Sequence, residues 1–186
     1  AALVHYQFET AHPFLDGNGR LGRLLITLML INDGVLHSCL FYPSFQFKKN
    51  RSEYYRQLTS VRERGTYEEW IEFFCNSLLE SAKDSVGSLK NLVDLHNRST
   101  ATITENLGRT AANGQRLLGI LEEHPIVDTA FIAAQLDIGR STASSLVKSF
   151  EELGILRPLD ESRQRYRQYG YEEYLSILRE DAEPIR

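Results

Sequence analysis

Apolar residues recur every three or four positions along most of the chain, and this spacing predicts a mainly α-helical protein. Expected helices in the first part cover residues 1–11, 20–32, 44–65 and 66–79. Between them stand residues that typically end helices: Pro13, the pair Asp33-Gly34, and Gly65. Residues 35–43 are expected to form a connector, and Ser44 to cap the helix that follows.

The pattern changes after residue 82. Residues 83–112 are polar and weakly helical, so we expect a helical connector with its softest point at 97–100. Residues 113–186 then predict three short helices, the third covering 141–153, followed by two short strands at 155–158 and 166–171 around a polar hairpin. We therefore predict a domain at 1–82, a connector at 83–112, and a second domain at 113–186.

Most candidate functional residues lie in one segment, residues 12–23, directly before an apolar helical run. Its sequence is His-Pro-Phe-Leu-Asp-Gly-Asn-Gly-Arg-Leu-Gly-Arg. Gly17 and Gly19 can adopt the backbone conformations that let successive N–H groups converge on an anion at the start of a helix. Arg20 and Arg23 share a helix face and could grip different phosphates of one polyphosphate. The interval predicts a phosphate site.

Two further residues of this interval suggest catalysis. Asp16 is a carboxylate of the kind that Mg²⁺ takes in ones or twos beside phosphate oxygens. His12 is the nearby group whose ordinary pKa suits proton transfer near neutral pH.

Residues 12–23 carry every fixed position of the Fic signature, His-x-Phe-x-(Asp/Glu)-Gly-Asn-Gly-Arg-x-x-Arg, and the chain therefore resembles the Fic family. The resemblance implies transfer of AMP from ATP to a Tyr, Thr or Ser hydroxyl of a target protein, with release of pyrophosphate. It implies His12 as the general base and Asp16 as the Mg²⁺ ligand. The expected phosphate-binding residues are Gly17, Asn18, Gly19, Arg20, Leu21, Gly22 and Arg23. Phe14 is expected to point into the core.

A second interval resembles the helix that follows the motif in Fic proteins and lines the nucleotide pocket. It runs from Asn50 to Arg62, and Gly65 and Trp70 follow. In that helix aromatic and polar residues flank the adenosine, so Tyr54, Tyr55 and Arg62 are the candidates on the base and ribose side. Core packing is the competing interpretation for each of them. We interpret His5 as an ordinary helix residue.

Fic domains normally carry several helices and a substrate-positioning hairpin before the motif, so the chain looks like the C-terminal part of a longer protein. Many family members also hold an inhibitory helix whose glutamate pairs with the second motif arginine, here Arg23. UMP or phosphocholine transfer remains an alternative, and phosphate transfer as in the Doc toxins is a further one. A homodimer and self-modification are also compatible with the resemblance.

Residues 113–170 resemble the winged helix-turn-helix domains of bacterial regulators. The resemblance is carried by Ile138-Gly-Arg-Ser-Thr-Ala-Ser-Ser-Leu-Val and Phe150-Glu-Glu-Leu-Gly-Ile-Leu. Arg140 and the alternating Arg163, Arg165 and Arg167 favour DNA binding. From Ala112 onward, however, nine Lys and Arg face thirteen Asp and Glu, which is a poor electrostatic footprint for DNA. A DNA-binding regulator with a nucleotide-sensing Fic half therefore stays the alternative, beside protein docking or dimerisation.

Composition and charge indicate which partners and which cellular compartment to expect, and say less about the reaction. The net charge is −4, which gives no general reason to expect an acidic membrane or a nucleic acid as partner. The longest apolar run, Leu24 to Ile31, is far too short to span a bilayer. Cys39 and Cys75 are expected to be buried small hydrophobic residues rather than a disulfide or a zinc site. We expect a cytoplasmic protein with no membrane partner.

Overall fold

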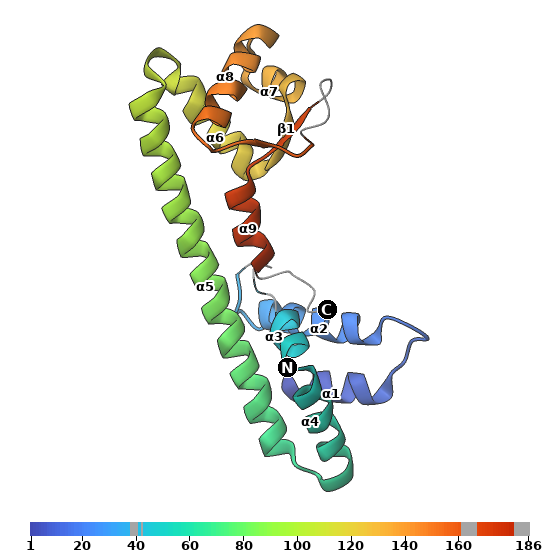
Figure 1. Cartoon of the computed structure of the whole chain (residues 1–186). Helices are drawn as coiled ribbons and strands as arrows, with labels where there is room; N and C mark the ends of the chain where they lie inside the picture. Colours follow the sequence, from blue (N-terminus) through green and yellow to red (C-terminus); the bar gives the residue numbers. More distant parts are fainter. Residues whose placement is uncertain (38–40, 42, 161–166, 181–186) are drawn as a thin grey trace. The chain divides into compact units, whose positions relative to one another are not determined.

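The computed structural model describes residues 1–37, 41, 43–160 and 167–180. It confirms a mainly helical protein with a small antiparallel sheet, which has three strands where the sequence predicted two (Figure 1). The chain divides into two compact units, residues 1–87 and 88–180. Each unit has its own hydrophobic core.

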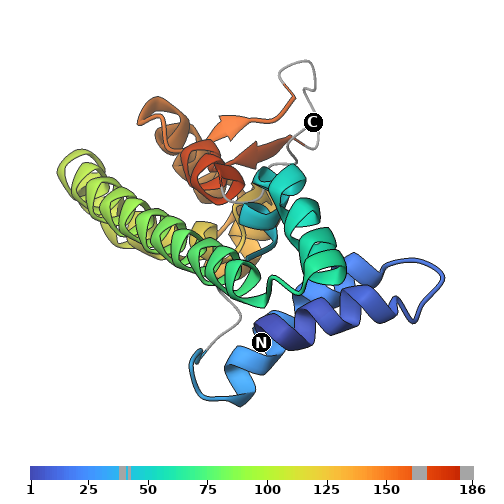
Figure 2. The same cartoon turned by 90° about the horizontal axis from the view of Figure 1, so that it is seen from below.

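The first unit begins with two antiparallel helices that lie side by side, α1 (Ala2–Ala11) and α2 (Asn18–Asn32), in Figures 1 and 2. The helices α3 (Pro43–Lys49), α4 (Arg51–Arg64) and the first part of α5 (Tyr67–Asn106) complete it. Helix α1 ends at His12, which takes the left-handed conformation (φ 45°), and Pro13 cannot continue the helix.

An aromatic core holds the helices of this unit together. Its centre is Trp70, which is wholly buried and donates a hydrogen bond of 3.0 Å from its indole Nε1 to the carbonyl of Ala2. Buried Trp indoles usually find such a partner. The other buried members are Tyr6, Ile26, Phe47, Tyr54, Leu58, Val61 and Phe74.

Two predictions about helix boundaries in this region are wrong. The helix expected at 44–65 is divided at Asn50 into α3 and α4, because the Asn50 side chain bonds the carbonyl of Gln46 at 3.1 Å and its backbone leaves helical geometry. The soft point expected at 97–100 lies inside the unbroken helix α5, which runs on to Asn106. Cys75, expected to be buried, is exposed; Cys39 lies outside the described residues.

The second unit contains the helices α6 (Ala111–Glu123), α7 (Thr129–Leu136) and α8 (Arg140–Glu152), preceded by the short η1 (Gly108–Thr110). The predicted strands are present as β2 (Arg157–Pro158) and β3 (Gln168–Gly170), and they pair antiparallel. Strand β1 (Ile126–Asp128) joins the other edge of β3, which gives the order β1-β3-β2. Helix α9 (Glu172–Glu180) follows. The sequence pattern predicted neither β1 nor α9.

Arg163 and Arg165 lie outside the described residues, as does most of the expected hairpin. Among the described residues, no helix has the length and apolar character needed to cross a membrane.

Side chains of α1 pack directly against the backbone of α2 at Gly22. A Cβ at this position would overlap Oε1 of Glu9 and come within 3.2 Å of both His5 and Phe8, so the close packing requires glycine. We expect Gly22→Ala to lower the free energy of unfolding by about 1–3 kcal/mol through overpacking. In the matched control Gly87→Ala, which adds a methyl group inside α5 with nothing within 4 Å, the stability should rise by up to about 1 kcal/mol. Chemical denaturation measures both, and equal effects would contradict the packing account.

Candidate active site

The motif forms a short loop between α1 and α2 that is shaped by one buried side chain, Asn18. The backbone N–H of Phe14 donates to Oδ1 of Asn18 at 2.9 Å, and Nδ2 of Asn18 donates back to the carbonyl of Phe14. Asn18 is only 1% exposed. Its side chain therefore closes the loop on itself, and the phosphate contact predicted for Asn18, which stays a prediction, would come from its backbone N–H.

The imidazole of His12 lies at the rim of this loop and is exposed. Its Nδ1 lies 3.4 Å from the carbonyl oxygen of Glu9. Because a carbonyl can only accept, this contact requires the proton on Nδ1 and leaves the lone pair of Nε2 free. A free Nε2 on an exposed imidazole is the arrangement that a general base needs.

The first turn of α2 presents backbone donors to the same loop. Gly17 adopts φ 83°, which favours glycine, and its carbonyl accepts the first helical bond from the N–H of Leu21 at 3.0 Å. The N–H groups of residues 18–20 precede that bond, at the positive end of the helix dipole. Gly19 is already helical, so only Gly17 uses the conformational freedom that we predicted for both.

Asp16 and Arg20 form an exposed ion pair at 3.4 Å, and the Asp16 side chain is 93% exposed. Among the described residues, no group of three or more His, Cys, Asp or Glu side chains is placed to hold a metal ion by itself. One accessible carboxylate beside a phosphate site fits Mg²⁺, which takes most of its ligands from phosphate oxygens and water. The donor set is therefore compatible with the expected magnesium.

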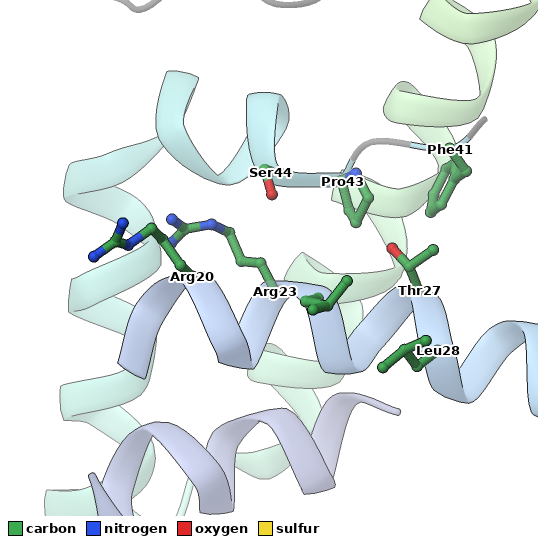
Figure 3. Close-up of a pocket in the computed structure, with 8 residues that line it drawn as sticks. Arg20, Arg23, Thr27, Leu28, Phe41, Pro43 and Ser44 are labelled. Carbon is green, nitrogen blue, oxygen red and sulfur yellow. The ribbon is translucent and has the colours of Figure 1, made fainter. Parts of the chain in front are cut away.

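Arg20 and Arg23 open onto a hollow of about 350 Å³ between α2 and α3. Figure 3 shows both guanidinium groups at one end of it, with the Ser44 hydroxyl directed between the two helices. The remaining lining residues are Leu24, Thr27, Leu28, Phe41 and Pro43. The hollow thus has a cationic end and a mostly apolar end.

Sequence reasoning named the two arginines but missed the rest of this lining. A signal was available for Leu24, Thr27 and Leu28, because they follow Arg20 and Arg23 at intervals of three and four on one helix face. Phe41, Pro43 and Ser44 reach the hollow through tertiary packing, which local spacing does not reveal.

Two predicted site residues have interior positions. Tyr54 is 4% exposed and its hydroxyl donates to Nε2 of His5 at 3.0 Å, while Nδ1 of His5 donates to the carbonyl of Gly22 at 2.9 Å. Tyr54 and Gly22 therefore serve the packing of α1, α2 and α4, instead of the nucleotide-facing positions that we expected. His5, interpreted as ordinary, is a buried link in this chain of bonds.

Burial lowers the pKa of His5 to about 4, because desolvation disfavours the imidazolium form. A histidine with a lowered folded-state pKa stabilises the protein above its unfolded pKa of about 6.5, and this stability is lost as the pH falls towards 4. We expect a loss of about 2 kcal/mol between pH 8 and pH 5. In His5→Gln, which does not titrate, urea denaturation should show a correspondingly smaller loss, and an unchanged pH dependence would refute the assignment. The exposed His96→Gln is the control.

The other predicted residues lie at the surface. Tyr55 is 53% exposed with the guanidinium of Arg51 5.6 Å from its ring centre, and Arg62 is exposed on α4. Neither lines the hollow. Leu21 is 41% exposed on α2. Phe14, expected in the core, is 52% exposed and touches only Phe8 among the ring contacts of the described residues.

The segment that contains the motif matches a known protein family. Residues 1–30, which span α1, the motif loop and most of α2, match the Fic/DOC family. The match covers the segment that places His12, Asp16, Arg20 and Arg23.

Curated relatives match a longer part of the chain. The protein adenylyltransferase fic-1 of Caenorhabditis elegans is 32% identical over 94 residues, which are 50% of this chain and 17% of the relative. Its namesake in Caenorhabditis briggsae is 32% identical over 90 residues, 48% of this chain and 16% of the relative. The protein adenylyltransferase Fic of Drosophila grimshawi is 37% identical over 76 residues, which are 41% of this chain and 14% of the relative. The matched part therefore spans less than a fifth of the length of these relatives.

Proposed function

We propose that the chain carries the catalytic motif of a protein adenylyltransferase, which transfers AMP from ATP to a Tyr, Thr or Ser hydroxyl of a target protein. One observation carries the proposal: the complete interval from His12 to Arg23 folds as a loop followed by a helix start, with both arginines facing a hollow. The names of the matched relatives support it.

In the proposed reaction Nε2 of His12 takes the proton from the target hydroxyl. The hydroxyl oxygen forms a bond to the α-phosphorus of ATP, the bond from that phosphorus to the bridging oxygen of the β-phosphate breaks, and pyrophosphate leaves. Arg20 and Arg23 stabilise the charge that develops on the leaving group, and the backbone donors at the start of α2 cradle the phosphates. Asp16 would hold Mg²⁺, which neutralises phosphate charge when bound.

Incubation of the chain with α-labelled ATP and Mg²⁺ tests the proposal, with the chain's own hydroxyls and an added cell extract as acceptors. Label should become covalently attached to protein and should disappear when the metal is chelated. Competition by unlabelled ATP but not by UTP or CDP-choline would separate AMP transfer from UMP and phosphocholine transfer. Absence of any metal-dependent label would contradict the proposal.

We further propose that residues 113–186 form a winged helix domain that serves docking or dimerisation. The element order α6, β1, α7, α8, β2, β3 and the antiparallel sheet β1-β3-β2 support the assignment. The DNA-binding regulator gains no support from the matches, whose names concern adenylyl transfer. We also propose a cytoplasmic setting, because a sequence with two cysteines far apart and no Cys-x-x-Cys spacing suits a reducing compartment.

A further inference from the structure

Glu9 occupies a slot between α1 and α2 that two glycines of the motif leave open. Its Oε1 lies where a Cβ on Gly22 would stand, and 4.0 Å from the place of a Cβ on Gly19. The same oxygen is fully shielded from water and has no hydrogen-bond partner among the described residues. A shielded, unpaired carboxylate oxygen is unfavourable, so its position calls for a compensating charge nearby.

On α2, the residue of opposite charge that acts on Glu9 is Arg23. Its Nη1 lies 3.3 Å from the Cβ position of Gly19, and Oε1 of Glu9 lies 4.0 Å from that position. The two atoms are therefore no more than about 7.3 Å apart, the sum of these distances, and at this range the charge of Arg23 acts on the Glu9 carboxylate through space.

Other titratable groups face Glu9 from the elements that pack against it. They are His5 and His12 from α1 and its C-terminal end, and Tyr54 from α4. His5 is neutral near pH 7, since its pKa is lowered to about 4, and Tyr54 is neutral because burial raises its pKa. Burial also raises the pKa of Glu9, while the positive charge of Arg23 opposes this effect. The Glu9 carboxylate thus depends on Arg23 for its stabilisation.

We propose that Glu9 is a positioning residue for Arg23. Its carboxylate attracts the guanidinium back across Gly19, along the first turn of α2, and so holds it at the end of the hollow where the polyphosphate would bind. This inference rests on the proposed function, in which Arg23 binds phosphate. The proposal also explains why residue 22 is glycine, although this position is not fixed in the Fic signature. Any side chain at Gly22 would displace Glu9.

A double-mutant cycle between Glu9 and Arg23 tests the proposal. Glu9→Gln keeps the shape but removes the charge, and we expect it to raise the Kd for a non-hydrolysable ATP analogue about tenfold, measured by calorimetry with Mg²⁺. In an Arg23→Ala background the same change should have no further effect. Glu9→Asp should recover part of the affinity. The control Glu53→Gln removes an exposed acid that binds Arg56 and Gln57 on α4, and should leave the Kd unchanged.

Two results would overturn the role of Glu9: an equal loss of affinity in both backgrounds, or tighter binding by Glu9→Gln, which would mark Glu9 as a competitor of the phosphate. The rate of AMP transfer at saturating ATP should also fall, because a displaced Arg23 stabilises the leaving pyrophosphate less well. The affinity measurement needs no turnover, so a chain that binds ATP without transferring AMP would contradict the proposed function while still deciding the role of Glu9.

Discussion

Replacement of His12 by alanine should lower the rate of AMP transfer by about 10²- to 10⁴-fold, the usual contribution of a general base. The structural reason is the contact between Nδ1 and the carbonyl of Glu9, which leaves Nε2 free to take the proton of the attacking hydroxyl. Binding of ATP should be nearly unchanged, because the imidazole acts on the target hydroxyl and not on the phosphates. Transfer of label from α-labelled ATP measures the rate, and calorimetry measures the binding.

His37→Ala is the matched control, since His37 is also exposed in the same unit and has no proposed role. It should retain the full rate. Equal labelling of the parent chain and His12→Ala would refute the base assignment, while a loss of ATP binding in His12→Ala would show that the residue acts on the nucleotide instead.

Asn18→Ala should reduce AMP transfer by about 10²-fold although Asn18 is buried. The substitution removes both bonds to the backbone of Phe14 and leaves a backbone donor and acceptor without their partner. Each unsatisfied group costs about 1–3 kcal/mol, so the loop between His12 and α2 should relax. A displacement of about 1 Å between base and phosphate site is enough for a rate loss of this size.

Asn32→Ala removes an exposed asparagine at the other end of α2 and should leave the rate unchanged. Asn18→Asp keeps the acceptor for the Phe14 N–H but lacks the donor for its carbonyl, so it should fall between the parent and Asn18→Ala. Circular dichroism should show the same helix content in all three. A full rate in Asn18→Ala would mean that the loop holds its shape without the clamp.

Local patterns predicted those parts of the fold that local chemistry determines. Pro13 and Gly65 do mark helix ends, and helix α2 follows the glycine turn as the motif required. The pairing of β2 with β3 also followed from short alternating segments around a polar turn. In each case the signal lies within a few residues of the structure that it specifies.

Contacts between distant segments could not be predicted in the same way. Tyr54 has an aromatic sequence context that suits a nucleotide pocket as well as a core, and only its bond to His5, 49 positions away, decides for the core. Glu9 gave no signal of its own, because its slot exists only where α1 crosses Gly19 and Gly22. Strand β1 is three residues long and is defined by its pairing with β3, far along the chain.

The most direct test of the central claim is to measure which phosphate of ATP becomes attached to protein. The chain should be incubated with Mg²⁺ and ATP labelled at either the α- or the γ-phosphate, and the covalently attached label compared. Adenylyl transfer predicts label on protein from the α-phosphate alone, with the γ-phosphate released as pyrophosphate. Attachment of the γ-label would contradict the account, because it would mean that the site bounded by His12, Arg20 and Arg23 transfers phosphate and not AMP.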